Sequence, residues 1–154
     1  MSASTTWNGL RLDVPSGWEA SERDDTLALF PQGTLPLIES GVPVDFVYFA
    51  CEPAAGADVH AIAQRRLERR VRQGEVEIVD ATFAGLSGVA FTWSDGVSRV
   101  DSWLVVHRDW VLDVQLAEPW IRTVGEGSLA DDARRICASV RAGEPLPKDP
   151  GPGT

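Results

Sequence analysis

The stretch SRVDSWLVVHRDWVLDVQLA, Ser98 to Ala117, contains two strand candidates separated by a tight-turn signal. Both alternating positions of each run are mostly apolar, which is typical of strands that are buried on both faces. A two-residue turn at Arg108 and Asp109 sets His107 opposite Trp110. This hairpin therefore predicts the centre of an antiparallel sheet.

Extending the pairing divides the side chains of this region between the two faces of that sheet. An Asp-Gly signal in SDGV, residues 94–97, predicts a second hairpin before the first. The further cross-strand neighbours predicted in this way are Val105 with Leu112, Trp103 with Val114, Val106 with Val111, Leu104 with Asp113, and Phe91 with Val100. Neither face is uniformly polar, so we expect both sides of the sheet to be covered.

Two amphipathic segments can supply that cover. In ADVHAIAQRRLERRVRQG, residues 57–74, hydrophobic residues recur at intervals of three and four, as on one face of a helix. SLADDARRICASV, residues 128–140, begins with Ser128 as a helix N-cap and places Asp131 three residues later, in the manner of a capping box. Between the early strands, the Pro- and Gly-rich residues 31–43 read as a long loop.

The order of elements predicts an α+β fold. Further strand candidates lie at Leu10–Val14, Thr26–Pro31, Val44–Cys51, 75–84 and 87–94. Together with the central hairpin they predict an antiparallel sheet of about six or seven strands, accompanied by two main helices. We expect one domain over residues 1–142, followed at 143–154 by a flexible tail rich in Pro and Gly.

Composition narrows the classes of function. The chain has 154 residues and a net charge of −9, which argues against general binding to nucleic acid or to anionic membranes. Its charged residues include a single lysine, Lys148, and its basic residues are otherwise arginines, a usage that suggests a bacterial genome rich in GC. With no secretory leader and no long apolar run, the sequence predicts a cytoplasmic protein without membrane insertion.

The sequence lacks the residue spacings that mark catalytic or metal sites. Cys51 and Cys137 lie far apart in apolar patterns and are predicted to be buried, reduced thiols. His60 and His107 have no clustered ligands and no nucleophile elbow nearby. GEGSLA, residues 125–130, matches a dinucleotide-loop pattern, but no strand follows its helix and Asp131 would repel a phosphate. We expect no metal, no cofactor and no catalytic residues, which favours a non-enzymatic protein without excluding an enzyme.

A corner near the N-terminus carries a resemblance to a known family. In LDVPSGWE, residues 12–19, an alternating run enters a Pro-Ser-Gly corner and leaves it with Trp18, which we expect to plug the core. Val14, Pro15, Gly17 and Trp18, with Ser139-Val140 in the last helix, give the chain from Trp7 to Arg141 a pattern that resembles the Mog1p/PsbP-like superfamily, which includes the DcrB-like bacterial proteins.

This resemblance implies a three-layer α/β/α sandwich around an antiparallel sheet. Members of the superfamily act mostly through protein contacts, as a partner of a small GTPase, a photosystem subunit or envelope-associated factors. They share no catalytic site that could be carried over to this chain.

Two regions carry candidate partner-binding residues. The first predicted helix carries a concentration of arginines, which are either a solvated face or a surface for an acidic or phosphate-bearing partner. The segment AEPWIRTVGEG, residues 117–127, adds a tryptophan and an arginine of the types that dominate binding hot spots. The candidate residues are Arg65, Arg66, Arg69, Arg70, Trp120 and Arg122.

The sequence therefore predicts a non-enzymatic bacterial protein-interaction or accessory domain whose partner is another protein. The alternative is a small-molecule binding protein or enzyme with a pocket between sheet and helix, near Trp103 and Asp113. Asp113 lies on a mostly apolar face, where it either reaches solvent at an edge or pairs with Arg99, Arg122 or a ligand. An exposed apolar patch would favour the first function, and a cavity with converging polar groups the second.

Overall fold

The structure, a computed structural model, describes residues 2–53, 56, 58–68, 76–94, 96–107, 109–121 and 128–142. Its helices are α1 (Leu35–Glu39), α2 (Val59–Glu68) and α3 (Ser128–Ser139). Its strands are β1 (Ser2–Trp7), β2 (Leu10–Pro15), β3 (Trp18–Arg23), β4 (Thr26–Pro31), β5 (Phe46–Pro53), β6 (Val79–Phe83), β7 (Leu86–Ser94), β8 (Ser98–His107), β9 (Trp110–Pro119) and β10 (Arg141–Ala142).

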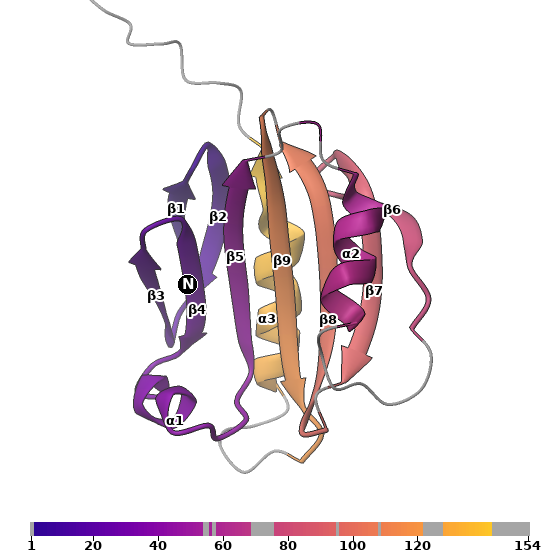
Figure 1. The fold of residues 1–154 in the computed structure, drawn as a ribbon. Coiled ribbons are helices and arrows are strands. Elements are labelled where there is room, and N and C mark those ends of the chain that lie inside the picture. The colour runs from indigo at the N-terminus through magenta and orange to yellow at the C-terminus, as the bar shows by residue number, and fades with distance from the viewer. Residues whose placement is uncertain are drawn as a thin grey trace, which may run out of the picture.

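A seven-stranded antiparallel sheet forms the centre of the molecule, in the strand order β3-β4-β5-β9-β8-β7-β6 (Figure 1). The β8–β9 hairpin has the register expected from the sequence, since His107 pairs with Trp110 and Leu104 with Asp113. The prediction of about six or seven antiparallel strands in this sheet is confirmed. The expected fold class, an α+β sandwich, is confirmed with it.

The neighbouring hairpin differs from the expected register. Phe91 pairs with Ser102, and Trp93 takes the place opposite Val100. The prediction of Phe91 beside Val100 is therefore wrong. Ser94 pairs with Arg99, with four residues between them in the chain, whereas the predicted register would pair Ser94 with Val97 and leave two residues between them. A shift of two residues leaves each side chain on its expected face, because the side-chain period of a strand is two.

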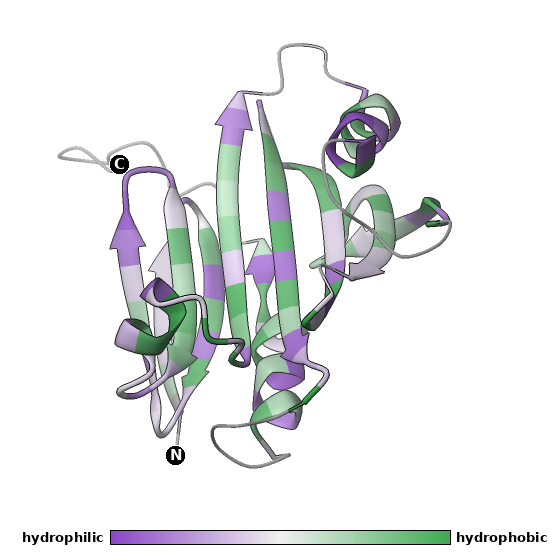
Figure 2. Ribbon diagram, turned by 60° about the horizontal axis from the view of Figure 1, so that its bottom comes forward, coloured by the Kyte–Doolittle hydropathy of each residue, from purple (hydrophilic) through white to green (hydrophobic). Residues whose placement is uncertain are grey.

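The two faces of the large sheet are covered by different elements. On one face α2 packs on β7 and β8 and contributes Ala63 and Leu67 to a hydrophobic cluster. On the other face α3 contributes Ala133 and Ile136 to a larger cluster, together with side chains of a second, three-stranded sheet. Figure 1 shows the two helices on opposite sides of the sheet, and Figure 2 shows mainly hydrophobic central strands and a hydrophilic edge strand, β3. Both faces are therefore covered, as expected.

The second sheet, in the order β1-β2-β10, is the main departure from the expected topology. The strands on either side of the Pro-Ser-Gly corner do not pair with each other, because β2 pairs with β1 and β10, and β3 pairs with β4. The corner at Gly17, whose φ is 88°, instead moves the chain from the small sheet to the large one. Trp18 is buried just after it, and its indole N–H donates to Asp132 of α3 at 3.3 Å, which confirms its role as a core plug.

Three smaller expectations have mixed outcomes. Residues 31–43 are not a loop throughout, because Pro36 near the N-terminus of α1 favours a short helix there. Residues 69–74 of the first predicted helix and the tail at 143–154 lie outside the described residues. Within the part of the chain that the structure describes, no helix is long and apolar enough to cross a membrane.

Both cysteines are free thiols, as expected. Cys51 is buried, whereas the Cys137 residue taken as a whole is partly exposed to solvent. Burial of its sulfur, together with the negative charge of Asp101, nevertheless raises the pKa of Cys137 to about 12.

Gly88 provides a test of how closely β7 approaches β8. A Cβ atom at this position would collide with the carbonyl oxygen of Leu104 and lie 2.7 Å from the Cα atom of Val105. We expect Gly88→Ala to lower the free energy of unfolding by about 1–3 kcal/mol, the usual effect of overpacking. Ser87→Ala, an exposed neighbour on the same strand, should stay within about 0.5 kcal/mol of the wild type in the same urea titration. Equal stability of the two variants would contradict the close approach.

The raised pKa of Cys137 predicts a loss of stability at alkaline pH. Between the ordinary value of 9.0 and about 12, the unfolded chain loses this proton while the folded chain keeps it. The unfolded state is thereby favoured, and stability should fall by up to about 1.4 kcal/mol per pH unit from this residue. Urea unfolding across this pH range should show a flatter profile for Cys137→Ala than for the wild type. Parallel profiles would mean that the thiol ionises equally in both states.

Candidate functional site

Arg66 lies inside an ion-pair network on the face of the sheet that α2 covers. Its guanidinium group donates to the carboxylate of Asp113 on β9 and, at 2.6 Å, to the carboxylate of Glu52 on β5. Asp113 is only 6% exposed, so its charge would be costly without a partner. The network therefore attaches α2 to two strands. The expectation that Asp113 reaches solvent at an edge is wrong, because it is buried on an interior strand, and the partner that the structure shows is Arg66 rather than Arg99 or a ligand.

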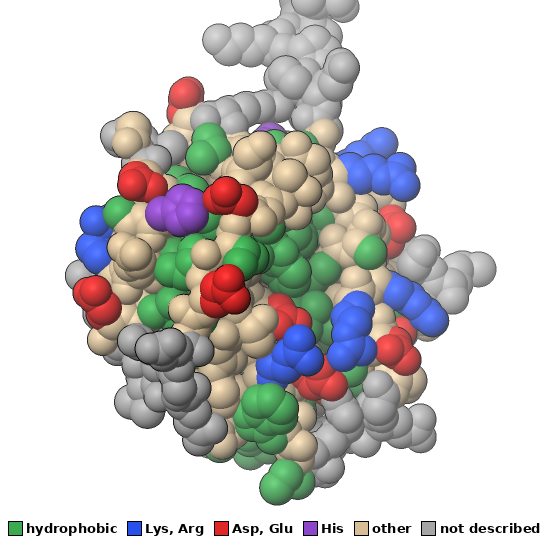
Figure 3. All heavy atoms as spheres, turned by 90° about the vertical axis from the view of Figure 1, so that its right-hand side faces the viewer, with side chains coloured by type: hydrophobic (Ala, Val, Ile, Leu, Met, Phe, Trp, Pro, Cys, Tyr) green, Lys and Arg blue, Asp and Glu red, His purple; other side chains and the backbone are tan. Residues whose placement is uncertain are grey.

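Of the other candidate arginines, the structure describes Arg65 alone. Arg65 is exposed on α2, whereas Arg69, Arg70 and Arg122 lie outside the described residues. On the face seen in Figure 3, basic and acidic side chains are interspersed rather than separated. Among the described side chains, this distribution is typical of a solvated surface.

The expected pocket residues Trp103 and Asp113 do not come together. Trp103 pairs with Val114, and Asp113 pairs with Leu104. Because neighbouring residues of a strand point to opposite faces, Trp103 lies on the α3 face and Asp113 on the α2 face. Trp103 packs against Phe83, with ring centroids 5.2 Å apart, so it is part of the core on its side of the sheet.

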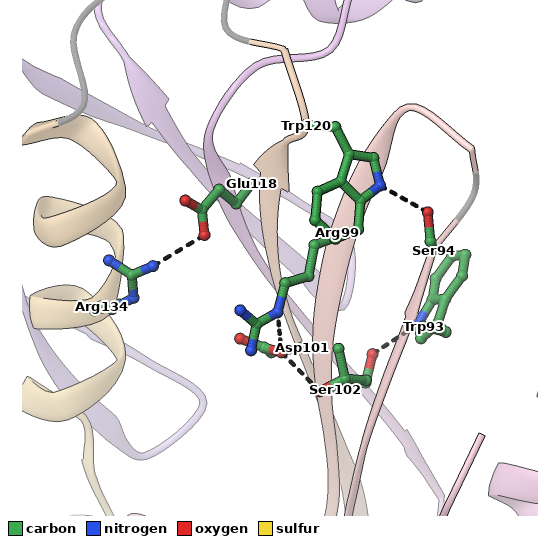
Figure 4. Close-up of polar contacts among 9 residues, drawn as sticks. Trp93, Ser94, Arg99, Asp101, Ser102, Glu118, Trp120 and Arg134 are labelled. Atoms are coloured by element: carbon green, nitrogen blue, oxygen red, sulfur yellow. Dashed lines mark hydrogen bonds and ion pairs between the residues drawn. The ribbon is translucent and has the colours of Figure 1, made fainter. Parts of the chain in front are cut away.

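Trp120 lies just beyond β9, where an exposed apolar surface forms at one end of the sheet. The exposed fractions are 51% for Val97, 59% for Trp120 and 79% for Ile121. The backbone N–H of Trp120 donates to the carbonyl oxygen of Val97 at 3.0 Å, and its indole N–H donates to Ser94 Oγ at 2.9 Å. Figure 4 shows the indole held over the end of the β7–β8 hairpin. We call Val97, Trp120 and Ile121 the Trp120 surface.

Two ion pairs lie next to the Trp120 surface. The Arg99 Nε atom is 3.4 Å from a carboxylate oxygen of Asp101, and Arg134 on α3 donates to Glu118 at 2.9 Å (Figure 4). Asp101 also accepts a hydrogen bond from Thr92 at 2.8 Å. The exposed indole is therefore bordered by charged groups that are already partly ordered.

A cavity of about 240 Å³ lies at the other end of β9. The described residues that line it come from five places in the chain and are Asn8 of the β1–β2 turn, Asp25 of the β3–β4 turn, Cys51 of β5, His107 of β8 and Trp110 of β9. Cys51 and His107 are buried and form its floor, whereas the other three are exposed and form its rim. We call these five residues the end cavity.

The chemistry of the end cavity favours binding over nucleophilic catalysis. Burial raises the pKa of the Cys51 thiol above its usual 9.0; a hydrogen bond with the Asn8 side chain opposes this shift, and the negative charge of Asp25 adds to it. The thiol is therefore protonated at neutral pH, and a thiol is a poor nucleophile compared with a thiolate. The backbone N–H of Cys51 donates to the carbonyl oxygen of Asp25 at 3.0 Å, which fixes the β3–β4 turn against β5.

The sequence analysis predicted none of the five residues of the end cavity as site residues, although local signals for some of its turns were present. Asn8 and Gly9, with φ angles of 49° and 80°, form the two-residue turn that Asn-Gly strongly favours, so WNGL marked a hairpin before β2. Asp24 and Asp25 form the turn between β3 and β4. Their approach to Cys51 had no local signal, because it depends on the pairing of β4 with β5.

The described residues offer no set of three His, Cys, Asp or Glu side chains close enough to hold a metal ion. His60 of α2 instead lies 2.9 Å from a carboxylate oxygen of Asp80 of β6, and both side chains are largely exposed. This pair joins the start of α2 to the edge strand at the surface.

The Arg66 network predicts a structural effect of this arginine. Arg66→Ala leaves the Asp113 carboxylate buried without its partner, so we expect a loss of about 2–4 kcal/mol, near the low end for buried pairs because Arg66 is a quarter exposed. Arg65→Ala should change the free energy of unfolding by less than about 0.5 kcal/mol. Combining Arg66→Met with Asp113→Leu should restore most of the loss, because no charge then remains buried. Equal, small effects of Arg65→Ala and Arg66→Ala would show that the pair does not stabilise the fold.

Similarity to known proteins is detected at the level of structure. No protein-family model matches the chain, and no curated protein matches it by sequence. LpqN of Mycobacterium tuberculosis, described as involved in cell envelope biogenesis, matches with a TM-score of 0.56 and 15% identity over 92% of this chain and 90% of LpqN. Cyanobacterial PsbP (CyanoP) from Synechocystis sp. PCC 6803 matches with a TM-score of 0.54 and 12% identity over 92% of this chain and 91% of that chain.

A third match extends beyond this chain. A protein from Bacteroides thetaiotaomicron VPI-5482 has a TM-score of 0.53 and 10% identity over 88% of this chain, which spans 46% of that protein's chain. LpqN and PsbP are members of the Mog1p/PsbP-like fold, so the resemblance inferred from the Pro-Ser-Gly corner is confirmed at the level of fold. The architecture of this chain is therefore the α+β sandwich of the Mog1p/PsbP-like proteins.

Proposed function

We propose that this chain is a non-enzymatic bacterial protein-interaction domain that binds another protein through the Trp120 surface. The observation that carries this proposal is the state of Trp120, which is more than half exposed although its indole N–H donates to Ser94 and its backbone N–H donates to Val97. A large aromatic side chain exposed to water without a partner is unfavourable, and tryptophan is enriched among the residues that dominate binding energies.

The ordering of the indole reduces the cost of binding. A side chain that must be immobilised on binding loses rotamer freedom, which weakens the complex by about 0.5–1.5 kcal/mol. The two hydrogen bonds of Trp120 hold it over a hairpin of the large sheet before any partner arrives. Ile121 and Val97 extend the apolar area beside it.

The neighbouring charges indicate the chemistry of the partner surface. Arg99 and Arg134 are about half exposed, and each is already paired with a carboxylate. A partner surface complementary to this region therefore has an apolar socket for Trp120 and Ile121, bordered by polar groups of both signs. Arg66 supports the fold rather than this surface, because its guanidinium group binds Asp113 and Glu52.

Capture from the native bacterial cell tests the proposal. The purified chain should retain a specific protein, identified by mass spectrometry, and a photo-crosslinking amino acid at Ile121 should join to that protein. Trp120→Ala should weaken binding of the purified partner by at least about 30-fold, as expected for a hot-spot residue. Ser94→Ala removes one hydrogen bond that orders the indole, so it should weaken binding by only about 3–10-fold.

Two control positions carry apolar side chains with comparable exposure elsewhere on the sheet. Val79 on β6 and Val106 on β8 are 44% and 40% exposed, so Val79→Ser and Val106→Ser should leave the affinity unchanged. Crosslinking from Val79 should give no product with the partner. The proposal is wrong if Trp120→Ala binds as well as the wild type, or if the Trp120 surface only joins two copies of this chain in sedimentation experiments.

A further inference from the structure

The end cavity is separate from the Trp120 surface, because the two lie at opposite ends of β9. Its volume of about 240 Å³ is below the roughly 300–1,000 Å³ typical of pockets for drug-sized ligands. The polar side chains of Asn8, Asp25 and His107 converge on it, and its floor is buried. These features suit a small molecule with a few polar contacts rather than a protein segment.

The charges at the end cavity select the sign of its ligand. Of the described residues that line it, none is a lysine or arginine, and Asp25 places a carboxylate on the rim. The Asp25 carboxylate would repel an anionic ligand and attract a cation.

The side chains of the end cavity also indicate the shape of the ligand. Trp110 is 40% exposed, and its indole offers a flat apolar surface that also attracts cations. Asn8 and His107 provide hydrogen-bonding groups on the rim and the floor. The Cys51 thiol, neutral at physiological pH, presents a soft and weakly polar surface beneath them.

We propose that the end cavity binds a small organic cation, an ammonium group on a compact apolar body. The ammonium group lies against the Asp25 carboxylate, and the apolar body lies against Trp110. Asn8 and His107 bind polar substituents near the charge. This binding activity is independent of the protein interaction at the Trp120 surface.

Three probes with one aromatic body and different charges test the proposal by calorimetry on the full chain. Phenethylammonium carries a positive charge, phenylethanol is neutral and phenylacetate is negative. We expect phenethylammonium to bind at least about tenfold more tightly than phenylethanol, because the carboxylate attracts only the charged probe. Phenylacetate should bind most weakly. Equal affinities for the three probes, or no binding of phenethylammonium, would overturn the proposal.

Two aspartates that are adjacent in sequence provide a matched pair of variants. Asp25→Asn and Asp24→Asn remove the same formal charge, but only Asp25 lines the cavity. Asp24 has a φ of 53°, a conformation that asparagine adopts readily, so its replacement should not strain the turn. Asp25→Asn should weaken the binding of phenethylammonium at least about tenfold and leave the affinity for phenylethanol unchanged. Asp24→Asn should have a much smaller effect on the binding of phenethylammonium. Equal effects of the two variants would assign the attraction to the overall charge and contradict a site at Asp25.

The Cys51 thiol gives a second readout that reports from inside the cavity. Asp25 contributes to the raised pKa of this thiol, and a bound ammonium group offsets that contribution. In a Cys137→Ala background, the thiolate absorbance of Cys51 should therefore appear at lower pH with phenethyltrimethylammonium, a quaternary analogue that stays charged at alkaline pH, than with phenylethanol. A titration that is identical with both probes would mean that the cation binds away from Cys51, which would also contradict the proposal. Trp120→Ala should leave all of these measurements unchanged.

Discussion

The β8–β9 hairpin has apolar side chains on both faces, and this property constrains the rest of the molecule. Leu104 and Val111 need cover on one side, and Val105, Leu112 and Val114 need it on the other. Helix α2 supplies the first cover, while α3 and the small sheet together supply the second. Because burial of apolar surface is the main favourable contribution to folding, a sheet of this kind is stable only between two layers.

This arrangement leaves the ends of the sheet as places for recognition. The faces are occupied by packing, whereas the loops and hairpin ends stay in contact with solvent. The two ends of β9 offer different chemistry. One projects an apolar surface that is held in place by hydrogen bonds to a neighbouring hairpin, and the other encloses a cavity with a buried thiol and imidazole below an acidic rim. A convex aromatic surface suits a protein, and a small acidic concavity suits a small cation.

Polar contacts within the covered faces attach the helices to the sheet. On the α2 side, the carboxylate of Asp113 would be unfavourable among apolar neighbours, and the guanidinium group of Arg66 compensates for it. On the α3 side, the indole of Trp18 donates to Asp132 and connects β3 to the last helix. Hydrophobic packing is not directional, so such contacts set the position of each helix more sharply than apolar burial alone.

The sequence by itself determined the features that depend on nearby residues: the register of the β8–β9 hairpin, the two covered faces, both main helices and the buried Trp18. Alternation, helical period and turn chemistry act over a few residues, so each of these can be recognised locally. Even here one signal was overlooked, the Asn8-Gly9 turn that creates β1. For the β7–β8 hairpin, the Asp-Gly signal predicted a connection that is two residues shorter than the one in the structure.

Only the tertiary structure decided which distant segments meet. The division into two sheets, the partnership of Arg66 with Asp113, and the convergence of Asn8, Asp25 and Cys51 join residues that are far apart in the chain. Nothing in a strand's own pattern states which edge it will pair with, because many edges offer the same backbone hydrogen bonds. The choice depends on the combined fit of all layers, and that fit placed a cavity at one end of the sheet and an exposed tryptophan at the other.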